Sequence, residues 1–128
     1  LIQSRSQMID QMSIYLAGRA AEQIIFGDIS SGAADDLRRT GEIARHMVIE
    51  LGMGPSLGAQ SFVREDNHPL SQQTLEQIDG EVAKLVAEAM ERAHDLLRSR
   101  RGALDRLATA LAERETLDAD EIRNFIDA

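Results

Sequence analysis

The sequence predicts an all-α fold of several helices, with a C-terminal antiparallel helical bundle and one irregular loop at about residues 52–69. Two observations support this prediction. Apolar residues recur at helical spacing through long segments, and the 128 residues include only 2 prolines. Hydrophobic residues make up 43% of the chain and charged residues 28%, a balance that supplies a core and argues against intrinsic disorder. The length predicts a single domain.

The first helix is predicted from about residue 5 to residue 26. Its apolar residues recur every three or four positions and form a wide stripe along one face. Ser4 or Ser6 is the expected N-cap, because a hydroxyl oxygen can accept a hydrogen bond from a free N–H of the first turn. Gly27 is placed to end the helix.

The second helix is predicted from about residue 33 to residue 51. Asp35 and Asp36 then fall in its first turn, where carboxylates interact favourably with the helix dipole. Judged on residue types alone, plain capping is the favoured interpretation of this acidic pair. A metal-ligand role also stays open, although one carboxylate cannot make a zinc site by itself, since such sites need three or four ligands.

Glycines and prolines interrupt residues 52–69, so this stretch is predicted to be irregular. A long third helix follows, capped by Ser71 and ending near residue 99, with apolar residues at core spacing. A fourth helix ends near residue 113. A fifth is predicted at about residues 118–126, where an aspartate is followed three residues later by a glutamate. The last three helices are expected to form the antiparallel bundle.

Composition excludes several functional classes. The chain has no cysteine, which rules out disulfides and cysteine zinc sites, and its net charge of −8 argues against nucleic-acid or anionic-membrane binding. No apolar run approaches the roughly 18 residues of a membrane span. The three histidines, His46, His68 and His94, are far apart, so the HExxH pattern is absent and each is interpreted as a surface or half-buried residue.

Four motifs resemble, in order along nearly the whole chain, the peptidase domain of FtsH-type ATP-dependent zinc proteases. Residues 16–28 read LAGRAAEQIIFGD, where the family has a pattern close to LGGRAAEEIVFGE. Residues 31–37 read SGAADDL and are similar to the family's TGASNDL. Residues 78–82, IDGEV, resemble IDxEV, and residues 115–122, ETLDADEI, resemble ETLDxxEI.

The resemblance implies a peptidase site in which zinc is held by the two His of HExxH and by a downstream Asp. Carried over, that Asp is Asp36, which would be the third zinc ligand and would leave the fourth position for water. Asp35 stands where the family usually has Asn, and both a tuning effect on the zinc-bound water and simple helix capping stay open. Glu22 is a weaker alternative, either as a ligand or as a group that supports one.

The resemblance also implies that the HExxH helix, an ATPase module and a membrane anchor lie upstream of Leu1. Residues 1–128 would then be one partial zinc-metallopeptidase domain, with the helices near the metal in residues 1–51 and the bundle in residues 71–128. The parent would be a membrane-anchored homo-hexamer that uses zinc and ATP to degrade protein substrates. This domain would lie on the cytoplasmic side, or on the matrix or stromal side in an organelle, and would reach the membrane only through other segments.

Three hypotheses follow for the chain. In the first it belongs to a zinc endopeptidase and supplies Asp36 and an oligomerisation surface, while the chain alone is soluble, inactive and unable to bind zinc tightly. In the second it is a non-catalytic assembly or binding module from a pseudoprotease. In the third it is a generic acidic helical bundle. The first predicts that Asp36 lies near an open edge where a further helix would pack, and not inside the C-terminal bundle.

Overall fold

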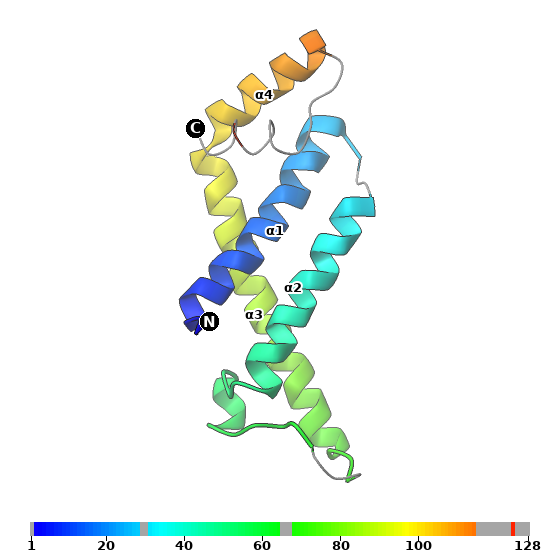
Figure 1. Cartoon of the computed structure of the whole chain (residues 1–128), viewed down its shortest axis with the longest axis vertical. Helices are drawn as coiled ribbons and strands as arrows, with labels where there is room; N and C mark the ends of the chain where they lie inside the picture. Colours follow the sequence, from blue (N-terminus) through cyan, green and yellow to red (C-terminus); the bar gives the residue numbers. More distant parts are fainter. Residues whose placement is uncertain (1, 29–30, 65–67, 115–123, 125–128) are drawn as a thin grey trace.

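The computed structural model describes residues 2–28, 31–64, 68–114 and 124. These residues form helices and irregular connections, without any β-strand, which confirms the all-α prediction (Figure 1). The elements in chain order are α1 (Arg5–Phe26), α2 (Ser31–Ile49), the 3₁₀-helix η1 (Pro55–Leu57), α3 (Gln72–Ser99) and α4 (Arg101–Arg114). Within the same described ranges, no helix is both long enough and apolar enough to cross a membrane.

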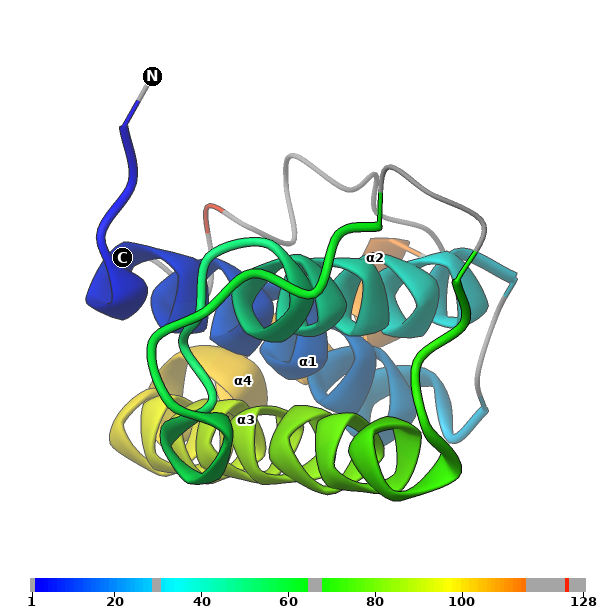
Figure 2. The ribbon, with the colours of Figure 1, turned by 90° about the horizontal axis from the view of Figure 1, so that it is seen from below.

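Three helices make the main body. α2 runs back antiparallel to α1, and α3 packs against both of them (Figures 1 and 2). α3 is the longest element, and its 28 residues span about 42 Å at 1.5 Å per residue. α4 follows after a single residue, leaves α3 at an angle, and contacts α1 as well as the end of α3.

In the described residues α1, α2 and α3 form a three-helix bundle, because the apolar stripes of the first two helices each need a partner and α3 is long enough to cover both. The predicted bundle of the last three helices includes residues outside the described part, so it stays a prediction. The fifth helix, predicted at about residues 118–126, falls outside the described residues except for Asn124, so it stays a prediction.

The core fills the space between these helices. Side chains at three- and four-residue spacing are buried on the facing sides of the helices, as the apolar pattern predicts. Ile9, Met12 and Leu16 of α1 and Met47 and Val48 of α2 are each at most 1% exposed. From α3 the buried residues are Ile78, Glu81, Leu85, Ala89, Ala93 and Leu97.

The ends of α1 follow the sequence closely. Ser4 is the N-cap: its hydroxyl accepts a hydrogen bond from the Gln7 N–H at 3.1 Å, and the Gln7 side chain accepts one in return from the Ser4 N–H at 2.8 Å. Gly27 ends the helix in the left-handed conformation with φ of 68°, a backbone state that glycine adopts without steric cost. These two caps define the bounds of α1, Arg5–Phe26.

The predicted irregular loop is held at two points. The Phe62 N–H donates to the Ile49 carbonyl at 2.7 Å, and the Phe62 side chain is buried in the core. At η1, the Ser56 hydroxyl donates to the Glu81 carboxylate of α3 at 2.6 Å, although Glu81 is only 4% exposed. Gly54 permits this close approach, because a Cβ there would lie 3.2 Å from the Glu81 side chain.

Acid is expected to weaken this attachment. The hydrogen bond from Ser56, helped by Lys84 and opposed by burial, holds the pKa of Glu81 below its ordinary value of 4.5. A carboxylate with a lowered folded-state pKa stabilises the fold fully above its unfolded pKa and loses that contribution as the pH falls through the folded pKa. The difference in unfolding free energy between the native chain and Glu81→Gln should therefore shrink toward low pH in urea titrations. A difference that stays constant with pH would contradict this assignment.

Candidate metal centre

Asp36 lies in the second turn of α2, not in the first. The helix begins at Ser31, two residues before the predicted start, so Asp35 and Asp36 are its fifth and sixth residues and its first turn holds no acidic side chain. The prediction that the acidic pair sits in the first turn is wrong. Capping therefore does not account for either carboxylate, because capping side chains act within the first turn.

The Asp36 side chain faces α1. Its Oδ2 lies 4.0 Å from the position that a Cβ would take at Gly18, and Asp36 is partly buried. The backbone carbonyl of Asp36 also accepts a hydrogen bond from the Thr40 hydroxyl at 2.8 Å, and Thr40 is only 1% exposed. The contact with Gly18 places the Asp36 carboxylate at the junction of α1 and α2, and the bond from Thr40 holds the Asp36 backbone.

Asp35 points elsewhere. Its carboxylate accepts a hydrogen bond from the Arg38 guanidinium at 2.9 Å, and its side chain is 54% exposed. That hydrogen bond is the largest cause of the raised pKa of Arg38. The extra negative charge at this position is thus met by a neighbouring cation on the outer face of α2, about a quarter turn from Asp36.

Glu22 shares a helix face with Gly18. The two residues are four apart in α1, so Glu22 lies about one turn, or about 6 Å, farther along the helix on the side that meets α2. Glu22 is partly buried. Among the described residues Glu22 belongs to no cluster of potential metal ligands, and its predicted role stays a prediction.

The described residues do not assemble a complete metal site. Among them, no group of three or more His, Asp or Glu side chains could hold a metal ion together. His46 is near the end of α2, where its Nδ1 lies 2.8 Å from the Glu50 carboxylate, and His94 lies on α3. Catalytic zinc sites use three protein ligands, so the described residues alone do not make such a site.

Sequence reasoning missed the two residues that place Asp36. Gly18 looks like an ordinary helix residue in a run of small side chains, and only the packing shows that Asp36 lies above it. The hydrogen bond from the Thr40 hydroxyl to the Asp36 carbonyl was not foreseen either. The sequence did contain a signal for this bond: Thr40 follows Asp36 by four residues, and a threonine hydroxyl in a helix can donate to the carbonyl four residues before it.

The described residues thus form an all-helical chain in which one partly buried carboxylate, that of Asp36, lies at the contact of α1 with α2. The sequence pattern of peptidase family M41 matches residues 1–125. The chain belongs to peptidase family M41, which confirms the resemblance found in its motifs.

The curated relatives carry the name ATP-dependent zinc metalloprotease FtsH. The Thermotoga maritima protein is 38% identical over 96% of this chain, and the Thermus thermophilus protein is 40% identical over 97%. The Burkholderia pseudomallei protein is 38% identical over 96%. The chain spans only 22%, 21% and 20% of the lengths of these three relatives, so their whole activities are not properties of these 128 residues.

Proposed function

We propose that this chain is the part of an ATP-dependent zinc metalloendopeptidase that supplies the third zinc ligand, Asp36. The observation that carries the proposal is the position of the Asp36 carboxylate, partly buried against Gly18 and set in the family motif SGAADDL. Two His ligands and the general-base Glu would come from residues outside the described part. When bound, the zinc would act as a Lewis acid and lower the pKa of a bound water.

The geometry favours Asp36 over its neighbours for this role. A metal ligand has to be held in one place, and Asp36 is packed at the junction of two helices. Asp35 is exposed and committed to Arg38, so its carboxylate would have to give up that pair to reach the same site. Glu22 sits on the correct face of α1, where it could hydrogen-bond a ligand.

The remaining features of the parent follow from the same proposal. Residues 1–51 hold the helices nearest the metal, and residues 71–128 form a C-terminal helical part. ATP is used in a separate module, protein substrates are degraded, and the protein works as a homo-hexamer to which this chain contributes an oligomerisation surface. Other segments anchor it to a membrane, with this domain on the cytoplasmic, matrix or stromal side.

Metal removal from the full-length protein tests the proposed activity. Incubation with a zinc chelator should abolish hydrolysis of casein, and added zinc should restore it, because the peptidase site depends on the metal. ATP hydrolysis should continue in the chelated protein when Mg²⁺ is resupplied. Casein hydrolysis that survives complete zinc removal would reject the proposal, and a full-length protein that never holds zinc would support the assembly-module alternative.

The isolated 128-residue chain is expected to bind zinc weakly and to leave casein intact. Asp36 offers one carboxylate, whereas tight zinc sites use three or four ligands, so titration calorimetry should show no high-affinity site. An Asp36→Asn chain is the matched control and should behave like the native one. Zinc-dependent casein hydrolysis by the pure native chain would contradict the view that its catalytic groups come from elsewhere.

A further inference from the structure

Gly18 lies in the interior of α1 and is exposed. Glycine is the poorest helix former after proline, so a glycine at such a position calls for a reason in the packing. The described residues supply none. Beyond its own stretch of helix, a Cβ built at Gly18 meets one atom within 4 Å, the Oδ2 of Asp36 at 4.0 Å, which is an ordinary van der Waals contact. The described part of the chain therefore has room for a side chain at this position.

An apolar side chain and a carboxylate flank this bare stretch of helix. Ile14 precedes Gly18 by four residues, so the two share a face of α1, and Ile14 is 64% exposed. Asp36 of α2 borders the same stretch and is partly buried. A glycine without a side chain lets another segment of backbone approach closely. These three residues, the Gly18 surface, thus offer a place where a further segment can pack beside the Asp36 carboxylate.

The distances within a zinc site require a close approach at this surface. Zinc holds a carboxylate oxygen at about 2.0–2.2 Å and a histidine nitrogen at about 2.0–2.1 Å, so two ligands of one ion are about 3–4 Å apart. The Oδ2 of Asp36 is itself 4.0 Å from the Cβ position at Gly18. A segment that brought two histidine nitrogens to this oxygen would therefore share the space beside Gly18 with the metal.

We propose that Gly18 keeps this surface clear for the segment that carries the other two zinc ligands, which lies outside the described residues. Gly18 is then a positioning residue, because its missing side chain lets that segment come close enough for its ligands to meet Asp36. The chain spans only 20–22% of the lengths of three relatives, which leaves ample polypeptide to provide the segment. The inference rests on the proposed function and adds to it a steric requirement at residue 18.

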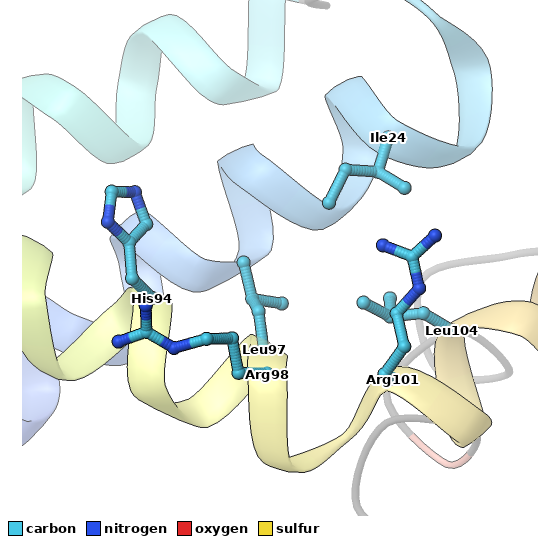
Figure 3. Close-up of a pocket in the computed structure, with 6 residues that line it drawn as sticks. All are labelled: Ile24, His94, Leu97, Arg98, Arg101 and Leu104. Atoms are coloured by element: carbon cyan, nitrogen blue, oxygen red, sulfur yellow. The ribbon is translucent and has the colours of Figure 1, made fainter.

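The pocket where α1, α3 and α4 meet is a separate feature (Figure 3). Figure 3 labels the residues described around it, and neither Gly18 nor Asp36 is among them. The two arginines at its rim already pair with Asp95 and Asp105 of their own helices. This pocket therefore takes no part in the inference.

The experiment enlarges residue 18 in two steps and measures stability and zinc binding separately. In the 128-residue chain, Gly18→Ala and Gly18→Leu should raise the midpoint of urea unfolding, because both residues are better helix formers than glycine and the position is open. In the full-length protein, Gly18→Leu should weaken zinc affinity at least about tenfold, as changes in residues that support a zinc ligand do. Gly18→Ala should weaken it less. Zinc affinity is measured by competition with a chromogenic chelator.

The matched controls are Gly80→Ala and Gly80→Leu in α3. Gly80 is also an exposed helical glycine, with nothing within 4 Å of its Cβ position. These variants should raise the urea midpoint in the same way and leave zinc affinity at the native value. The inference is overturned if Gly18→Leu lowers the midpoint of the 128-residue chain, or if Gly80→Leu weakens zinc binding as much as Gly18→Leu does.

Zinc binding also separates this inference from the proposed function. Native zinc binding that is lost in Asp36→Asn but kept in Gly18→Leu overturns the role of Gly18 alone. A native full-length protein that holds no zinc rejects the proposed function and this inference with it.

Discussion

Replacing Asp36 by Asn in the full-length protein is expected to lower zinc-dependent casein hydrolysis by at least about 100-fold. Changes in residues that merely support a zinc ligand cost 10- to 100-fold, so loss of a ligand carboxylate should cost no less. Asn keeps the size of the side chain at the contact with Gly18, and the backbone hydrogen bond from Thr40 does not involve the side chain. The measurement is the initial rate of casein hydrolysis, with ATP hydrolysis followed in parallel and expected to persist.

Asp35→Asn is the matched control for this prediction. It removes a carboxylate one residue away that is exposed and paired with Arg38, so hydrolysis should stay within a few-fold of the native rate. The two variants together distinguish a ligand from general loss of negative charge near the metal. Full hydrolysis by Asp36→Asn, or equal losses in both variants, would refute the assignment of Asp36 as the ligand.

Replacing Ile9 by Ala is expected to lower the free energy of unfolding by about 3 kcal/mol, within the usual 2–5 kcal/mol for such core truncations. Ile9 is 0% exposed in α1 and belongs to the core cluster shared with α2 and α3. Removal of its side chain beyond Cβ leaves a cavity among rigid helices that cannot fully close.

Ile14→Ala provides the comparison, because the residue type and the helix are the same but the side chain is 64% exposed. Its effect should stay within about 0.5 kcal/mol. Urea unfolding measures both variants by circular dichroism and by fluorescence of Tyr15, the single tyrosine in a chain without tryptophan. The Cζ atom of Arg39 in α2 lies 5.8 Å from the centre of the Tyr15 ring, so the tyrosine fluorescence reports on the contact of α1 with α2. Equal losses of unfolding free energy in the two variants would contradict the assignment of Ile9 to the core and Ile14 to the surface.

Much of the fold could be predicted because its signals are local. The caps Ser4 and Ser71, the glycine at the end of α1 and the periodic apolar residues of α3 all act within a few positions of the chain. The start of α2 was placed two residues late because the small residues before Asp35 read as a turn. Which helices form the bundle depends on long-range packing that periodicity does not encode.

The candidate site, like the fold, could be predicted only in part. The motif resemblance predicts Asp36 as the ligand, but residue types could not separate it from Asp35, since both are aspartates in one helix. Their surroundings differ because neighbouring residues on a helix point about 100° apart, which turns Asp36 toward α1 and leaves Asp35 beside Arg38. The attachment of Glu81 to Ser56 was also hidden, since the two residues are 25 positions apart.

The most direct test of the account is to locate zinc in crystals of the full-length protein by anomalous diffraction at the zinc edge. The account predicts one zinc per chain at the junction of α1 and α2, with an Asp36 carboxylate oxygen about 2.0–2.2 Å away and two His ligands from outside the described residues. A zinc ion bound without Asp36, or one coordinated through Asp35 in its place, would contradict it.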